Sequence, residues 1–225
     1  MTGEVTIVSR QNERIREAKR LVQKKYRDQT GRFLVEGVRL VEEALEASLA
    51  EQLFFTERLL NSDRGKALIH RAHRQGLEVF SCSEAVLDEL TDTVHAQGVA
   101  AIARKPSWPA PAEGLLVIAD EIQDPGNMGT LLRTAVAVGV QGLLAVKGSV
   151  DLYSSKVVRA SMGAVFQLPH WMAERGDILD LLQSRGISIA VTQLEDAENF
   201  WDVAYPPSVE VVIGNEARGV HPSFR

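Results

Sequence analysis

The sequence predicts an α/β protein composed of two domains. Helical and strand-like segments alternate along the chain, and several apolar runs in its second half lack the polar–apolar alternation of half-exposed strands. Between the halves, Pro106, Pro109 and Pro111 predict a stiff, extended linker. We therefore expect domains at 1–104 and 114–225, connected by a linker at 105–113.

The first domain is expected to form a small α/β/α sandwich. Apolar residues recur at helical spacing and predict helices at 10–27, 38–49, 64–75 and 83–90. Short apolar runs predict strands at 33–35, 52–56, 77–80 and 99–103. Gly31 and Gly76 stand where the chain is expected to leave a helix.

The second domain is expected to contain a parallel sheet covered on both faces. Continuous apolar runs predict strands at 115–119, 142–146, 187–192 and 209–213. Helices are expected at 129–138, 152–161 and 176–185, with Gly139 and Gly186 just beyond two of their ends.

Composition limits the class of protein. The 225 residues are 45% hydrophobic and 24% charged, and no apolar run approaches the ~20 residues of a membrane span. The first residues lack the apolar centre of a signal peptide. The single cysteine, Cys82, excludes an internal disulfide framework, and the histidines show no metal-ligand spacing. We expect a cytoplasmic protein without a bound metal.

Charge is distributed unevenly along the chain. Residues 1–39 carry ten Lys or Arg against five Asp or Glu, whereas the whole chain has a net charge of −5. Four basic residues would share one face of a continuous helix over 10–27: Arg16, Arg20, Lys24 and Arg27. A solvated surface is the simpler interpretation, but the acidic remainder favours an anionic partner such as RNA phosphates.

A glycine-rich turn follows the first strand of the second domain, in 120-DEIQDPGNMGTLLRTA-135. Pro125 and Gly126 favour a sharp bend, and Asn127 is expected to cap a helix that begins near Gly129. Arg133 then lies one to two turns into that helix. An ordinary strand–turn–helix connection is the alternative, and the absence of GxGxxG and GxxxxGK[ST] leaves a dinucleotide or NTPase site unsupported.

A second turn, 214-GNEARGV-220, follows the last strand. Ligands of open α/β sheets bind beyond the carboxyl ends of strands, where both turns are expected. Glu216 is therefore either a solvated carboxylate or a partner that orients Arg133 through charge-assisted hydrogen bonds.

The two turns, together with S-S-K-V-V-R-A-S-M-G-A at 154–164, resemble the SpoU-type (TrmH-like) RNA ribose 2′-O-methyltransferases. The resemblance covers 115–220. In the first half, 31-GRFLVEGVRLVEEAL-45 and 96-AQGVAAIARKP-106 resemble the substrate-recognition domain of several members. This resemblance implies a SPOUT-type trefoil-knot methyltransferase domain, a homodimer, S-adenosylmethionine (AdoMet) as cofactor and RNA as substrate, with ribosomal RNA favoured over transfer RNA.

The resemblance also implies roles for individual residues. The catalytic candidates are Asn127, Arg133 and Glu216. The cofactor-binding candidates are Thr192, Leu194, Gly214, Asn215 and Gly219. On the RNA side, the resemblance adds Arg159 and Ser161 to the four basic residues of 10–27.

Arginine is a poor base, because its pKa lies above about 12. We therefore expect Arg133 to grip the phosphate beside the target ribose and to stabilise the developing alkoxide, with proton abstraction by Arg133 as the alternative.

Family members continue with a third motif that contains S-L-N, and residues 1–225 do not include it. We interpret the sequence as part of a longer chain and expect weak or absent cofactor binding by these residues alone. A non-enzymatic RNA-binding protein that retains the fold is the alternative.

Overall fold

The computed structural model describes residues 6–91, 97–110, 114–194, 197–206 and 209–225. The chain forms two compact units, one of Met1–Pro106 with Tyr153–Phe166 and the other of Ser107–Leu152 with Gln167–Arg225. A segment from the second half of the sequence thus belongs to the first unit. Part of the expected linker, 111–113, lies outside the described residues.

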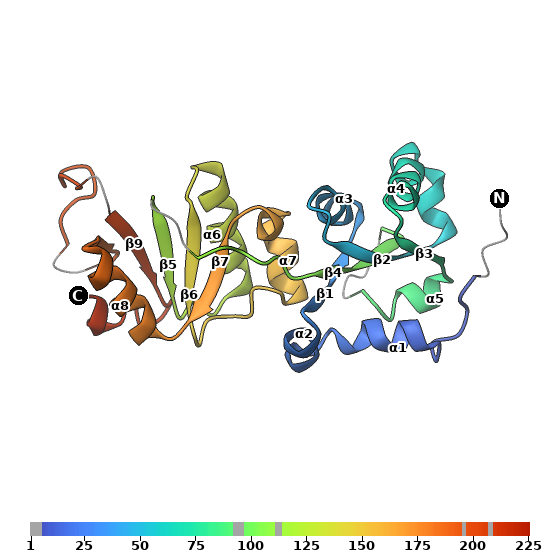
Figure 1. The fold of residues 1–225 in the computed structure, drawn as a ribbon, viewed down its shortest axis with the longest axis horizontal. Coiled ribbons are helices and arrows are strands. Elements are labelled where there is room, and N and C mark those ends of the chain that lie inside the picture. The colour runs from blue at the N-terminus through green and yellow to red at the C-terminus, as the bar shows by residue number, and fades with distance from the viewer. Residues whose placement is uncertain (1–5, 92–96, 111–113, 195–196, 207–208) are drawn as a thin grey trace. The chain divides into compact units, whose positions relative to one another are not determined.

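The first unit is built on a four-stranded mixed sheet in the order β1-β4-β2-β3 (Figure 1). Strand β4 runs antiparallel to β1 and β2, while β2 and β3 are parallel. Its strands are β1 (Arg32–Glu36), β2 (Ala50–Phe55), β3 (Glu78–Ser81) and β4 (Val99–Arg104). Its helices are α1 (Glu13–Arg20), α2 (Lys24–Thr30), α3 (Val38–Glu46), α4 (Asp63–Arg74), α5 (Glu84–Leu87) and α7 (Ser155–Ser161).

Both faces of this sheet are buried, as the sandwich prediction requires. Alternate residues of β1 and β2 point to opposite sides. Phe33 and Leu53 pack in a cluster with α3 and α4, whereas Leu34 and Phe54 pack in a second cluster with α1 and α5. The strands are therefore positioned by apolar burial on both sides.

The segment 153–166 contributes to the first of these clusters. Val158, Val165 and Phe166 are buried there, and the Phe166 ring stacks on Phe33 with centroids 5.8 Å apart. Tyr153 contacts the same Phe33 ring, at 5.0 Å. Helix α7 and the residues after it are thus part of the core of the first unit.

The single helix expected over 10–27 is wrong, because α1 ends at Arg20 and α2 begins at Lys24. Gln23 has extended backbone angles between them. The buried Arg27 guanidinium stabilises the break by donating to the carbonyls of Leu21 and Val22, at 2.8 and 2.6 Å. These bonds satisfy backbone acceptors that a continuous helix would have used internally.

The second unit is built on a five-stranded parallel sheet in the order β7-β6-β5-β9-β8. Its strands are β5 (Leu116–Asp120), β6 (Gly142–Val146), β7 (His170–Ala173), β8 (Ser188–Val191) and β9 (Val209–Gly214), and its helices are α6 (Pro125–Ala137) and α8 (Arg175–Arg185). Helix α8 packs on one face through Ile178 and Leu182. The sequence predicted four of these strands and missed β7.

The parallel arrangement brings the two glycine-rich turns together. Strands β5 and β9 are neighbours, and Asp120 at the end of β5 is paired with Gly214 at the end of β9. The trefoil knot implied by the family resemblance stays a prediction. None of the helices in the described ranges combines the length and apolarity that crossing a membrane requires.

Glu210, on β9, makes the stability of this sheet depend on pH. Its side chain is buried and accepts the backbone N–H of Leu116. Burial raises its pKa to about 7, although the Leu116 N–H and the positive charge of Arg185 act in the opposite direction. The folded protein therefore holds a proton on Glu210 between its ordinary pKa of 4.5 and about 7, and stability is lost as pH rises through this window.

We expect Glu210→Gln to be more stable than the unmodified protein by roughly 1–2 kcal/mol at about pH 8, and equally stable at about pH 4. The glutamine retains an oxygen for Leu116 but carries no charge. Urea unfolding of both proteins at the two pH values measures this difference. A difference that does not change with pH would contradict the assignment to Glu210.

Candidate active site

Helix α6 begins at Pro125, earlier than expected. Asp124 Oδ1 accepts the backbone N–H of Asn127 at 2.8 Å, and Pro125 occupies the first turn. Proline suits this position because it has no N–H to satisfy and its φ is already helical. The expectation that Asn127 caps a helix starting near Gly129 is therefore wrong, and Asp124 is the N-cap.

Glu216, from the turn after β9, binds this same first turn of α6. Its Oε1 accepts from the backbone N–H of Asp124 and from Asn127 Nδ2, both at 3.0 Å, and its Oε2 accepts from the backbone N–H of Gln123 at 3.1 Å. Burial alone would raise the pKa of Glu216, but the hydrogen bonds from Asn127 and the two amides lower it to about 2. The carboxylate is therefore charged at neutral pH and faces the positive end of the helix dipole.

Arg133 lies further along α6 and is exposed. Its Nη2 donates to Thr130 Oγ1 at 3.1 Å. Asn127, Thr130 and Arg133 are spaced three residues apart and so follow one side of the helix, starting at the end that Glu216 binds. A direct pair between Arg133 and Glu216 stays a prediction, since the contacts above join Glu216 to Asn127 and Arg133 to Thr130.

The turn after β9 folds back tightly on itself. The backbones of Asn215 and Gly219 exchange two hydrogen bonds of 3.0 and 2.9 Å. A Cβ at Gly214 would lie only 2.2 Å from the carbonyl carbon of Gly219, so the close backbone approach requires glycine. Gly219 itself has a φ of +69°, a conformation that glycine adopts without strain.

Asn215 fixes the position of this turn. Its Nδ2 donates to the Glu121 carbonyl at 2.8 Å, while its Oδ1 accepts the backbone N–H groups of Ala217 and Arg218, both at 3.0 Å. The side chain is therefore engaged within the protein, and Asn215 holds the turn against the end of β5.

A groove of about 750 Å³ lies along this turn. It brings together all five cofactor-binding candidates, and Glu216 also lines it. Thr192 Oγ1 donates to the Val212 carbonyl at 3.0 Å, and the Leu194 side chain is fully exposed. The lining residues are Thr192, Gln193, Leu194, Ile213, Gly214, Asn215, Glu216, Ala217, Arg218, Gly219, Val220 and Arg225.

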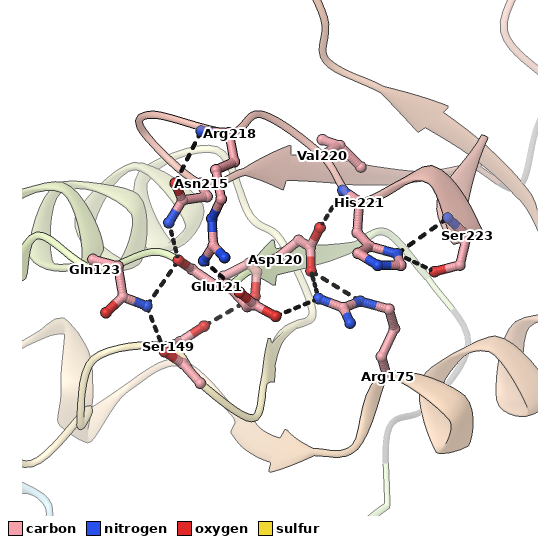
Figure 2. Close-up of polar contacts among 12 residues, drawn as sticks. Asp120, Glu121, Gln123, Ser149, Arg175, Asn215, Arg218, Val220, His221 and Ser223 are labelled. Carbon is pink, nitrogen blue, oxygen red and sulfur yellow. Dashed lines mark hydrogen bonds and ion pairs between the residues drawn. The ribbon is translucent and has the colours of Figure 1, made fainter.

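Asp120 and Glu121, at the end of β5, form the centre of a polar network (Figure 2). Asp120 is buried, with 1% of its surface exposed, and its Oδ2 accepts the backbone N–H of His221 at 2.7 Å. Arg175 Nη2 donates to Asp120 Oδ1 at 2.9 Å and to Glu121 Oε1 at 2.6 Å. Arg218 binds the other Glu121 oxygen at 2.7 Å. The hydrogen bond from Arg175 lowers the pKa of Glu121, so this carboxyl is held in its charged form.

Only part of this network could be predicted from the sequence. Asp120 and Glu121 were recognisable as a strand end, and Arg218 and His221 belong to or follow the second glycine-rich turn. No sequence pattern indicated Arg175, because it follows β7, the strand that was missed. Its role depends on tertiary structure.

The basic residues of 10–27 are placed differently from the expectation. Because α1 and α2 are separate, the four residues do not share one helical face. Arg16 is exposed, the Arg20 guanidinium lies 5.7 Å from the centre of the Tyr26 ring, and Lys24 pairs with Asp28 at 2.6 Å. Arg27 is buried and holds the α1–α2 connection.

Arg27→Ala is therefore expected to destabilise the protein by about 2 kcal/mol, because buried carbonyls lose charged donors. Arg16→Ala is the matched control, with a stability change below about 0.5 kcal/mol for an exposed side chain. Denaturant unfolding and RNA affinity are measured for both variants. A loss of RNA affinity by Arg27→Ala at unchanged stability would contradict the structural role.

The two remaining RNA-side candidates lie on α7. Arg159 pairs with Glu36 of β1 at 3.4 Å, with its side chain 28% exposed. Ser161 is fully buried and donates to the Val158 carbonyl at 2.7 Å. Ser161 is therefore packed inside the protein and inaccessible to a ligand, whereas part of the Arg159 side chain remains accessible.

Comparison with known proteins gives two family matches that together span most of the chain. Residues 114–225 match the SpoU rRNA Methylase family, and residues 12–101 match the MRM3-like substrate binding domain. The 23S rRNA (guanosine(2553)-2′-O)-methyltransferase RlmP of Bacillus subtilis is 30% identical over 95% of this chain and 84% of its own length.

Solved structures agree with these matches. An AdoMet-bound rRNA methyltransferase from Sinorhizobium meliloti superimposes with a TM-score of 0.84 at 29% identity, over 97% of this chain and 84% of the other. The SpoU methyltransferase AviRb from Streptomyces viridochromogenes, in complex with AdoMet, gives 0.84 at 26% identity, over 96% and 85%. The sequence, the fold and the paired turns all agree with these matches, and the chain belongs to the SpoU rRNA methylase family.

Proposed function

We propose that this protein transfers a methyl group from AdoMet to a ribose 2′-hydroxyl of structured RNA, and that ribosomal RNA is its substrate. The observation that carries the proposal is the link from Glu216, on the wall of the groove, to the first turn of α6. This link joins the groove and the helix bearing Arg133 at one end of the sheet. The names of the relatives, including RlmP, support the reaction and the substrate class.

The residues of the groove fit AdoMet. A volume of about 750 Å³ lies within the range of small-molecule sites, about 300–1,000 Å³. Gly219 leaves open space beside the wall where a side chain would otherwise stand, so a planar adenine ring could approach the backbone closely. The exposed Leu194 side chain offers apolar surface, and Thr192 a hydroxyl. AdoMet, when bound, supplies a methyl group on a positively charged sulfonium.

Arg133 is proposed to act on the RNA. Its guanidinium can bind a phosphate through two parallel hydrogen bonds. It can also stabilise the alkoxide that develops as the 2′-hydroxyl loses its proton. Glu216 is unsuited to the role of base, because its pKa of about 2 and its three hydrogen bonds leave it a stable anion. Glu216 and Asn127 instead hold α6, and with it Arg133, beside the groove.

The first unit is proposed to bind the RNA substrate. Support comes from its match to a substrate binding domain and from the net positive charge of residues 1–39. Phosphate contacts by exposed side chains such as Arg16 would add affinity and salt dependence without selecting a sequence. A homodimer is part of the same proposal and is tested by light scattering of the purified protein.

The function is tested with ribosomal RNA from a strain that lacks the gene. The full encoded chain is incubated with this RNA and AdoMet, and ribose methylation is mapped by reverse transcription; transfer RNA serves as a parallel substrate. We expect one new 2′-O-methyl site in ribosomal RNA. A site in transfer RNA alone would reassign the substrate. RNA binding without methylation in either pool would favour the non-enzymatic alternative.

A further inference from the structure

Both ends of the turn after β9 are attached to Asp120, the last residue of β5, and to Glu121, which follows it (Figure 2). At its start, Asn215 donates to the Glu121 carbonyl, and Arg218 binds the Glu121 carboxylate. At its end, the His221 backbone N–H binds the Asp120 carboxylate. The wall of the groove therefore takes its position from the corner formed by Asp120 and Glu121.

This corner is unfavourable without a cation. It places two adjacent carboxylates close together, one of them with only 1% of its surface exposed, and Glu121 has a φ of +56°, a left-handed conformation that costs a non-glycine residue energy. Arg175 binds both carboxylates with one guanidinium, through Nε and Nη2 to Asp120 and Nη2 to Glu121. Its side chain is 21% exposed, so it is only partly screened by water.

We propose that Arg175 is a positioning residue for the AdoMet groove, which it orders through Asp120 and Glu121 without lining it. The inference rests on the proposed function for the identity of the ligand. Arg175 is absent from the residues lining the groove, whereas Arg218 lines it and depends on the carboxylate that Arg175 orients. Loss of Arg175 leaves a buried carboxylate without its cation, so the corner and the attached turn lose their fixed geometry.

Arg175→Gln tests this role in the full encoded chain. AdoMet affinity is measured by calorimetry, and amide hydrogen exchange is measured at Ala217, Arg218 and His221 without ligand. We expect roughly tenfold weaker AdoMet binding and faster exchange at these three amides, because charged hydrogen bonds of this kind are each worth about one factor of ten or more. RNA affinity and exchange in β6 should not change.

Lys147→Gln is the matched control. Lys147 pairs with Glu174, the residue directly before Arg175, and both side chains of that pair are largely exposed. The control therefore removes a cation that lies beside the start of α8 without touching the corner. We expect its AdoMet affinity and its exchange at 217–221 to remain those of the unmodified protein.

A second substitution separates positioning from general damage. In the double variant Arg175→Gln with Asp120→Asn, the new asparagine keeps an oxygen for the His221 N–H and offers an N–H to the glutamine. We expect it to recover most of the lost AdoMet affinity and the slow exchange. Arg175→Lys keeps the positive charge but lacks the planar guanidinium that donates to both carboxylates. Its AdoMet affinity and amide exchange should lie between those of the unmodified protein and those of Arg175→Gln.

The outcomes distinguish the two proposals. Unchanged exchange in Arg175→Gln, or changed exchange with unchanged AdoMet affinity, would overturn the positioning role while leaving the proposed function intact. A double variant that recovers neither the AdoMet affinity nor the slow amide exchange would also overturn the positioning role. Failure of the unmodified protein to bind AdoMet would instead overturn the proposed function, and the exchange data would still decide whether Arg175 orders the turn.

Discussion

Replacement of Arg133 by lysine is expected to lower the rate of methyl transfer roughly 100-fold, the size of effect seen when one preorganised donor to a developing oxyanion is removed. Lysine keeps the positive charge but lacks the planar fork that binds two phosphate oxygens at once. AdoMet affinity should not change, because Arg133 does not line the groove. Single-turnover methylation of ribosomal RNA and calorimetry with AdoMet measure the two quantities separately.

Thr134→Ala provides the control for Arg133→Lys. Thr134 is the next residue of α6 and is also exposed, so the substitution changes an accessible position of the same helix without removing charge. We expect nearly normal turnover from this variant. Normal turnover by Arg133→Lys would remove the bidentate role from the mechanism, and equal loss in both variants would indicate a general effect of altering α6.

Gly214→Ala is expected to abolish measurable AdoMet binding. The added Cβ would lie 2.2 Å from the carbonyl carbon of Gly219 and 2.3 Å from the Val220 nitrogen, so the backbone of the turn would have to move. Forcing such an overpacked site typically costs about 1–3 kcal/mol of stability. The displaced turn is also the wall of the groove. Calorimetry and thermal unfolding would show loss of binding together with moderate destabilisation.

Gly176→Ala is the matched control for this substitution. Gly176 lies in α8, and a Cβ there would meet no atom within 4 Å. Alanine in a helix is favoured over glycine by about 0.5–1 kcal/mol, so this variant should be as stable as the unmodified protein or slightly more so. Unimpaired AdoMet binding by Gly214→Ala would show that the tight turn does not form the binding surface.

The sequence was sufficient to locate the paired turns, because their positions follow from local patterns. The apolar run that became β5 is buried throughout, the run that became β9 is buried at alternate positions, and glycines follow both strands. Parallel strands place their carboxyl ends at one edge, so Asn127, Glu216 and the groove residues could be expected near each other before the structure was known. The family resemblance added the roles of the individual residues.

Features that depend on long-range contacts were not predictable. Strand β7 contains His170, Trp171 and Met172 and has no distinct apolar run, so it was missed, and the environment of Arg175 was missed with it. The break between α1 and α2 depends on Arg27, which resembles its basic neighbours in sequence but is buried. In the same way, Ser161 belongs to a motif associated with RNA, yet its hydroxyl is turned to the Val158 carbonyl.

The membership of residues 153–166 in the core of the first unit affects how this gene can recombine. A crossover between the two halves of the coding sequence would join residues 1–106 to a foreign 153–166. Phe33 would then meet side chains that had not been selected to fill the space of Tyr153 and Phe166. Chimeras that exchange both segments together should fold, and we expect the two segments to be inherited as a pair.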